Sequence, residues 1–161
     1  MTKQQKSLLI TFFVLFAIIL FDQYTKYLIK TSMNIGQSIK IIGNFIRFTY
    51  VENTGIAFGI HLNNTYLFTG LSLLASTILA IYLYKNREEH MFLKVSLAMI
   101  LGGAFGNLID RIFFGKVVDF LDIGIGGLRW WIFNVADSAV VVGMFFLIIY
   151  LYRCDKCIKN E

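Results

Sequence analysis

Four apolar stretches, each long enough to cross a lipid bilayer as a helix, dominate this sequence and restrict its possible architecture. They cover about residues 7–29, 65–84, 91–109 and 130–152, and a membrane-spanning helix needs roughly 20 predominantly apolar residues. The chain is 57% hydrophobic and has no proline, which is too apolar a composition for a soluble domain of 161 residues. The sequence therefore predicts an all-α integral membrane protein with four transmembrane helices, in which residues 1–161 form a single membrane domain.

The distribution of Lys and Arg predicts how these helices are oriented. Four spans place both termini on one side, and basic residues concentrate in loops on the cytoplasmic side of a membrane. The short segments on the side of the termini are more densely basic than the long segments on the other side, so both termini should be cytoplasmic. The net charge of +5 reflects these loops. Because no basic patch with interleaved aromatic residues is present, nucleic acid is not expected to be a partner.

The two long segments on the outer side should be structured. Residues 45–50 alternate in the manner of a half-buried strand, and nearby glycines can supply turns, so residues 33–61 should form a small extracytoplasmic β-sheet. Residues 110–129 are too apolar for a solvated connection and too charged for a span, which predicts an interfacial outer loop or helix. Within the third stretch, the small residues at 102–106 should let another helix approach closely.

Polar residues are the second informative feature, because they gather at one depth of the membrane. Asp137 lies inside the last apolar stretch, and a charge near the bilayer centre costs on the order of 3 kcal/mol, so such a residue suggests a functional site. The other polar residues near this level, close to the outer boundary, are Asp22, Lys26, Asn53, Asn107, Asp110, Arg111, Asp119, Asp122 and Asn134. Helical spacing places Asn134 on the face of Asp137.

Several of these residues have structural interpretations. Asp22 and Lys26, at positions i and i+4, can form an ion pair near a helix end. Asp110 with Arg111 can connect another helix end to the sheet. Asp137 differs, because its own stretch contains no basic residue, and it needs a proton or a partner from another segment.

Asp119, in the neighbouring outer segment, is the candidate partner of Asp137. Two carboxylates within hydrogen-bonding distance cannot both ionise cheaply, so one retains a proton while the other acts as a base. Such a pair can activate water for attack on a peptide carbonyl and protonate the leaving amine. Two alternatives remain open at this point: a small proton-coupled transporter, and a non-enzymatic protein that binds lipid or peptide.

Other chemistries lack their motifs in this sequence, so neither a metal nor a cofactor is expected. HExxH is absent, and Cys154 and Cys157 form a lone CxxC without two further ligands nearby. Ser138 follows Asp137 without a nearby histidine or a GxSxG setting. The GIGG run at 124–127 lacks the Lys and Ser or Thr of a phosphate-binding loop.

Five motifs, taken in order, resemble those of the bacterial lipoprotein signal peptidases, the signal peptidase II family of aspartic peptidases. They are DQYTK at 22–26, ENTGIAFG at 52–59, GGAFGNLIDR at 102–111, VVDF at 117–120 and FNVADSAVVVG at 133–143. Each motif alone would be weak evidence. Together they extend from the first predicted helix to the last, which makes the resemblance specific.

The resemblance implies an aspartic endopeptidase of the bacterial plasma membrane that cleaves prolipoproteins just before the diacylglyceryl-modified cysteine. By position in the motifs, Asp119 and Asp137 correspond to the catalytic pair. The other matching positions, which would bind substrate or support the site, are Asp22, Lys26, Asn53, Gly55, Asn107, Asp110, Arg111 and Asn134. The implied partners are diacylglyceryl-prolipoprotein, membrane lipid and the inhibitory cyclic peptide globomycin, and the implied active site lies near the outer face.

Overall fold

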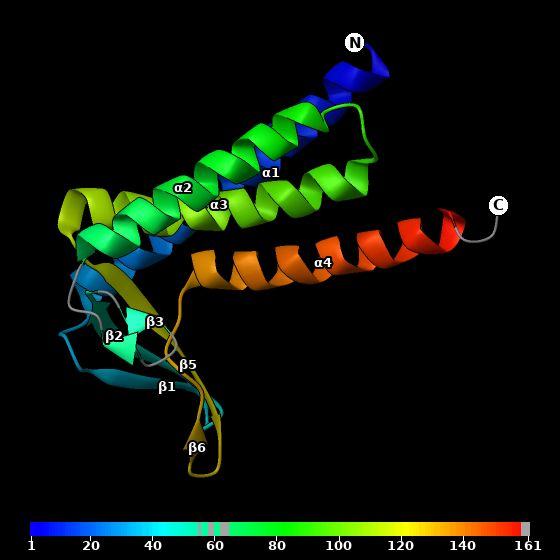
Figure 1. Ribbon diagram of the computed structural model, residues 1–161. Helices are drawn as coiled ribbons and strands as arrows, with labels where there is room; N and C mark the ends of the chain where they lie inside the picture. Colours follow the sequence, from blue (N-terminus) through cyan, green and yellow to red (C-terminus); the bar gives the residue numbers. More distant parts are fainter. Residues whose placement is uncertain (55, 58–59, 62–64, 159–161) are drawn as a thin grey trace.

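Four long helices form the body of the protein, and a small antiparallel sheet is attached at one end (Figure 1). The computed structural model describes residues 1–54, 56–57, 60–61 and 65–158, with side chains described for 1–54 and 66–153. Within these residues, four helices are long and apolar enough to cross a membrane. They are α1 (Lys3–Ser32), α2 (Thr65–Lys85), α3 (Met91–Phe114) and α4 (Val135–Ile158). The predicted four-helix membrane fold with a small sheet is confirmed.

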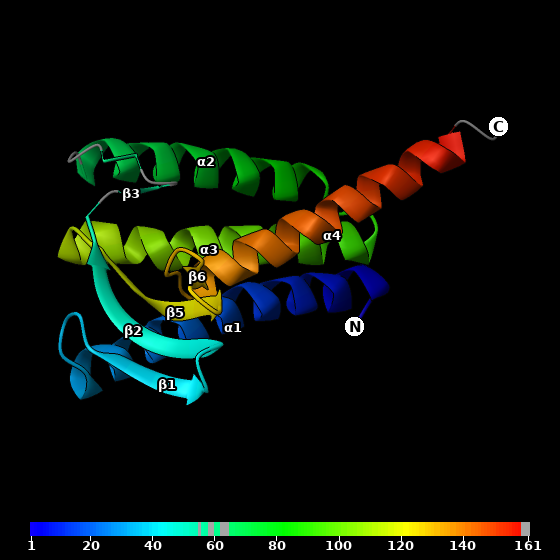
Figure 2. The ribbon, with the colours of Figure 1, turned by 90° about the horizontal axis from the view of Figure 1, so that it is seen from below.

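Helix α3 is the centre of the bundle, and α1, α2 and α4 each pack against it (Figure 2). In the most apolar stretch of α3, 67% of the residues are buried inside the protein, against 17% in α1 and α4 and 6% in α2. A Cβ at Gly103 would collide with the backbone carbonyl of Ala136, and one at Gly106 would lie 2.6 Å from Oδ2 of Asp22. The prediction for the small residues at 102–106 is therefore confirmed, because glycine lets α4 approach α3 closely.

The sheet combines two segments that are distant in the sequence. Its strands lie in the order β1-β2-β5-β6, and all neighbouring pairs are antiparallel. They are β1 (Ser38–Ile42), β2 (Ile46–Asn53), β5 (Val117–Ile125) and β6 (Leu128–Arg129), and a separate pair is formed by β3 (Ile56–Ala57) and β4 (Ile60–His61). Gly43 and Gly126 form the tight turns with φ of 52° and 62°, a conformation that is strained for residues with a Cβ.

An apolar cluster joins the sheet to the helices. Ile29 and Met33, at the end of α1, pack with Tyr50 of β2 and with Val118 and Phe120 of β5. All five side chains are buried. Since fully burying a large apolar side chain contributes about 1.5–3 kcal/mol, the cluster holds β5 firmly against α1. This packing positions Asp119, which lies between Val118 and Phe120, the two residues that β5 contributes to the cluster.

The structure corrects the prediction for residues 110–129, which were expected to form an interfacial loop or helix. Helix α3 continues to Phe114, and the chain then enters strand β5. The apolar composition of this segment has a different cause: Val117, Val118 and Phe120 are buried because β5 pairs with β2 and packs on α1. The composition of the segment itself does not reveal a strand partner from the distant residues 46–53.

Helix α4 begins at Val135, although the apolar stretch starts at Trp130. Phe133 instead forms an antiparallel bridge with Leu121 of β5, and its N–H donates to the Leu121 carbonyl. The extended approach to α4 leaves Trp130 and Trp131 largely exposed, which suits residues at a membrane interface. The chain therefore runs alongside β5 just before α4 starts.

Candidate active site

The two candidate catalytic carboxylates come from the sheet and from a helix start. Asp119 lies on β5 and is 5% exposed, whereas Asp137 lies in the first turn of α4 and is half-buried. Strand β5 and the start of α4 meet at the end of the bundle that carries the sheet (Figure 1). The two aspartates are thus brought to the junction of sheet and helices.

Asn134 links the two aspartates through one buried side chain. Its Nδ2 donates to Oδ1 of Asp119 at 2.7 Å, and its Oδ1 accepts from the backbone N–H of Asp137 at 2.9 Å. In return, Oδ2 of Asp137 accepts from the backbone N–H of Asn134 at 3.2 Å. This reciprocal pair has the form of a capping box, so the same bonds that start α4 also orient both aspartates.

Amide groups hold the Asp119 carboxyl group. Besides the bond from Asn134, its Oδ2 accepts from Nδ2 of Asn53 on β2 at 3.1 Å. Burial, reinforced by the negative charge of Asp137, raises the pKa of Asp119 to about 7, although both amides favour its ionised form. A carboxyl group with this pKa can hold a proton near neutral pH and can also release it.

Asn107 on α3 connects Asp137 to a buried ion cluster. Its Nδ2 donates to Oδ1 of Asp137 at 2.7 Å. Its Oδ1 accepts from Nζ of Lys26 at 2.9 Å and from Nδ2 of Asn134 at 3.0 Å. The NH₂ group of Asn107 therefore faces an acceptor, and its carbonyl oxygen faces two donors. This arrangement defines the orientation of the amide.

Lys26 lies between two carboxylates in the interior of the protein. Its Nζ is 2.7 Å from Oδ2 of Asp22 and 2.9 Å from Oδ2 of Asp110, and all three side chains are buried. The predicted ion pair of Asp22 and Lys26 is confirmed, and Asp110 shares it. Asp22 also accepts from the backbone N–H of Ala136 at 2.9 Å, and Asp110 accepts from that of Val118 at 3.4 Å. The cluster thus ties α1 and α3 to α4 and β5.

Gln23 belongs to the same network, although its sequence position did not single it out. Its Nε2 donates to Oδ1 of Asp110 at 3.0 Å and to the carbonyl of Gly106 at 3.1 Å, with Oδ2 of Asp22 at 3.3 Å. The available signal was its place inside the DQYTK run, directly after Asp22. A polar residue beside a predicted buried ion pair could have been expected to bond with it.

Arg111 supplies positive charge close to the two aspartates. It lies near the end of α3, within electrostatic range of Asp119 and Asp137, and its Nη1 donates to Oγ of Ser72 on α2 at 3.4 Å. No ion pair joins Arg111 to either aspartate among the side chains that are described. A guanidinium in this position can stabilise negative charge that develops on a bound carbonyl group.

The predicted site residues with described side chains all contribute to one region around the junction of α1, α3, α4 and the sheet. They are Asp22, Lys26, Asn53, Asn107, Asp110, Arg111, Asp119, Asn134 and Asp137. Gly55 lies outside the described residues, as do the side chains of Cys154 and Cys157. Over the described part of the chain, no group of three or more His, Cys, Asp or Glu is arranged to hold a metal ion.

Comparison with known proteins establishes the family. The family model described as signal peptidase (SPase) II matches residues 14–153. The chain belongs to the signal peptidase II family. A lipoprotein signal peptidase of Halothermothrix orenii is 45% identical over 145 residues, which cover 90% of this chain and 97% of the relative. Another from Moorella thermoacetica is 48% identical over 127 residues, covering 78% and 81% of the two chains.

Two solved structures of bacterial membrane enzymes share the fold. One, determined by the in meso method at 2.3 Å resolution, is 34% identical with a TM-score of 0.77, and the match covers 89% of this chain and 87% of that chain. The second, at 1.9 Å resolution, is 35% identical with a TM-score of 0.75 and covers 88% and 91% of the two chains. Together with the four apolar helices, these likenesses identify a multi-pass membrane protein of the signal peptidase II family.

Proposed function

We propose that this protein is an aspartic endopeptidase that removes signal peptides from lipoprotein precursors. Membership of the signal peptidase II family supports this reaction. The observation that carries the aspartic mechanism is the link between Asp119 and Asp137 through Asn134. Two neighbouring carboxylates held by amides can share one proton. The protonated group can then act as an acid and the ionised group as a base.

In the proposed reaction, Asp137 is the base and Asp119 is the acid. Ionised Asp137 takes a proton from a water molecule as that water attacks the scissile carbonyl carbon. Protonated Asp119 gives its proton to the carbonyl oxygen, which produces a neutral tetrahedral intermediate. Asp137 then passes its proton to the leaving nitrogen, the carbon–nitrogen bond breaks, and Asp119 recovers a proton from the collapsing diol. The raised pKa of Asp119 supports this assignment of the resting proton.

The other site residues would position this pair and the substrate. Asn53, Asn107 and Asn134 orient the two carboxylates through the hydrogen bonds described above. The ion cluster formed by Asp22, Lys26 and Asp110 would hold Asn107 in place, since Lys26 donates to its carbonyl oxygen. Arg111 would stabilise the carbonyl oxygen of the substrate. Gly55 is included because of its position in the ENTGIAFG motif.

The proposed substrate is a prolipoprotein whose cysteine already carries diacylglycerol, and cleavage would occur just before that cysteine. The sheet and the site lie at the end of the bundle opposite the start of α1 (Figure 1). With both termini in the cytoplasm, the site would lie near the outer face of the bacterial plasma membrane. The apolar part of the signal peptide would lie among the helices, while the acyl chains of the cysteine would remain in membrane lipid. Globomycin would inhibit the enzyme.

Incubation of the purified protein with a lipidated precursor tests this proposal. Mass spectrometry should show a product that begins at the lipidated cysteine, whereas an unlipidated precursor should remain intact. Cleavage should persist in the presence of a chelator and stop with globomycin. Tight precursor binding without any product would instead support the binding-protein alternative, and proton flux in sealed vesicles that depends on Asp137 would support the transporter alternative.

A further inference from the structure

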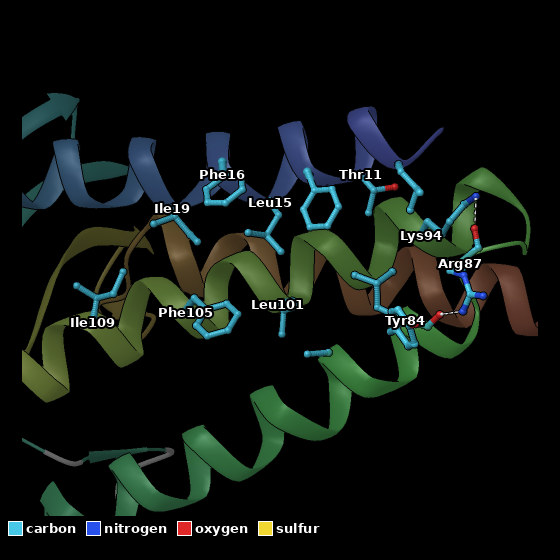
Figure 3. A pocket seen from close by; sticks show the side chains of 14 residues that line it. Thr11, Leu15, Phe16, Ile19, Tyr84, Arg87, Lys94, Leu101, Phe105 and Ile109 are labelled. Atoms are coloured by element: carbon cyan, nitrogen blue, oxygen red, sulfur yellow. Dashed lines mark hydrogen bonds between the residues drawn. The ribbon is translucent and has the colours of Figure 1, made fainter. Parts of the chain in front are cut away.

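An apolar cavity of about 500 Å³ lies between α1, α2 and α3, and its lining contains none of the candidate active-site residues. Leu15 of α1 and Leu101 and Phe105 of α3 line its length (Figure 3). Ala80 lines it from α2. Along α1 the lining residues run from position 8 to position 19, a length of about 16 Å at the rise of a helix. This length is close to the thickness of the hydrocarbon in one leaflet of a bilayer.

Two basic residues stand at one end of this cavity. Lys94, near the start of α3, and Arg87, in the connection between α2 and α3, line it there (Figure 3). Lys94 is only 4% exposed, and its Nζ donates to the backbone carbonyl of Arg87 at 3.1 Å. Among the described side chains, no carboxylate lies within ion-pairing distance of Lys94. A buried ammonium group with this environment lacks a compensating negative charge.

A polar hollow continues from the same two residues. It encloses about 930 Å³ at the end of the bundle near the start of α1. Its charged lining residues are Lys3, Lys6, Arg87, Glu88, Glu89 and Lys94, so positive charge prevails. Arg87 and Lys94 therefore lie at the boundary between an apolar cavity and a basic hollow. An anionic lipid has a matching arrangement, with apolar acyl chains next to a negatively charged headgroup.

We propose that this cavity holds one acyl chain of an anionic phospholipid whose phosphate contacts Lys94 and Arg87. The apolar wall matches the chain, and the phosphate provides the negative charge that Lys94 lacks. Basic residues at the edge of a membrane attract anionic headgroups. A zwitterionic lipid would fill the cavity but would bring its own cation next to the phosphate, in a region where positive charge already prevails, and a free phosphate would leave the apolar cavity unused. The lipid would bridge α1, α2 and α3 at the end of the bundle remote from Asp119 and Asp137.

Native mass spectrometry of the full-length, detergent-purified protein tests the site. Delipidated protein is titrated with phosphatidylglycerol, or with phosphatidylcholine that has the same acyl chains. We expect preferential retention of one phosphatidylglycerol molecule, and about fivefold weaker retention in Lys94→Gln and in Arg87→Gln. Lys85→Gln is the matched control, because Lys85 is an exposed cation nearby that lines neither cavity, and its retention should be unchanged.

Two further measurements separate the acyl chain from the headgroup. Ala80→Phe should fill part of the cavity and weaken retention of phosphatidylglycerol without any change of charge. Glycerol 3-phosphate, which has no acyl chains, should not compete. Circular dichroism identifies any variant that fails to fold, and in that case the remaining variants decide. Equal retention of the two lipids, retention unaffected by every folded variant, or full competition by glycerol 3-phosphate would each overturn the proposal.

Discussion

Two groups of buried carboxylates lie next to each other in this protein, and they differ in what holds them. Asp22 and Asp110 flank the ammonium group of Lys26 at 2.7 and 2.9 Å. Asp119 and Asp137 instead accept hydrogen bonds from neutral asparagine and backbone amides. Lys26 supplies a counter-charge within the first group, whereas the second group is held by neutral amides, with no cation at ion-pairing distance among the described side chains. We therefore expect the first group to be structural and the second to be the catalytic pair of the proposed reaction.

Strand β5 shows the same contrast between two of its own residues. Asp119 and Asp122 are each 5% exposed. Asp122 accepts from Nε of Arg129 at 2.6 Å and from Oγ1 of Thr49 at 2.8 Å. Burial opposes ionisation of Asp122, but these partners lower its pKa, whereas burial and Asp137 raise the pKa of Asp119 to about 7. Asp122 thus has the cation Arg129 as a partner, whereas Asp119 has amide partners and the negative charge of Asp137 nearby, and the two pKa shifts have opposite directions.

Removing one carboxylate of the amide-held group should have the largest effect. In Asp119→Asn and in Asp137→Asn, we expect cleavage of a lipidated precursor to fall on the order of 10³-fold, because the acid or the base is lost. The initial rate of product formation measures this loss. Asp122→Asn is the control on the same strand and should retain activity close to that of the unmodified protein. Near-normal activity in either of the first two variants would disprove the assignment of the pair.

Removing the cation from the ion-paired group should mainly reduce stability. Lys26→Met leaves Asp22 and Asp110 buried without their counter-charge, and breaking a buried pair in this way costs about 3–5 kcal/mol. The shift of the thermal unfolding midpoint in detergent measures the loss. Lys116→Met is the control, because its pair with Glu52 involves side chains that are 39% and 17% exposed and should contribute at most about 1 kcal/mol. Equal shifts in the two variants would contradict the structural role of the cluster.

Asn134 connects capping to the orientation of the aspartates, and two substitutions can separate these roles. Asn134→Ala should cost about 1–2 kcal/mol of stability through the lost cap, and it should also lower kcat. Asn134→Ser retains a capping oxygen but cannot donate to Asp119 as the amide does, so it should recover stability more than activity. Because the Asn134 amide favours ionised Asp119, the pH–rate profile of both variants should move to higher pH. An unchanged profile would argue against a positioning role.

The stability of the protein should also depend on pH, with opposite signs for the two aspartates of β5. The pKa of Asp119 rises from 3.8 to about 7 on folding, so the folded protein binds more protons than the unfolded chain between these values. Its contribution to stability is fully present below pH 3.8 and is lost as the pH rises through about 7. The unfolding midpoint of the unmodified protein should therefore fall across this window relative to that of Asp119→Asn.

For Asp122, the contribution to stability should change with pH in the opposite direction. Because its pKa is lowered in the folded protein, its contribution is present above the ordinary value of 3.8 and is lost as the pH falls through the lowered pKa. The difference between the unmodified protein and Asp122→Asn should thus grow with rising pH at the acidic end. If the unfolding midpoints of Asp119→Asn and Asp122→Asn changed with pH in the same way, the contrast between the two aspartates of β5 would be contradicted.

The sequence by itself determined the membrane class, the four helices and the level at which the polar residues gather. These features depend on composition and on local spacing, because a bilayer requires long apolar helices and penalises charges inside them. The i, i+4 spacing of Asp22 and Lys26 likewise predicted their ion pair, which is confirmed. The resemblance of the motifs to signal peptidase II predicted the family, which the family model confirms.

Only the tertiary structure decided how the segments between the helices are used. Residues 117–125 form a strand because β2 offers a partner, and Asp110 joins the pair of Asp22 and Lys26 because α3 packs on α1. Asn134 can bond with Asp119 because the chain returns along β5 before α4 begins. Such contacts join residues that are distant in sequence, and local patterns do not encode which distant groups will meet. Packing therefore gave four similar aspartates different partners, and these partners distinguish two ion-paired carboxylates from two carboxylates held by amides.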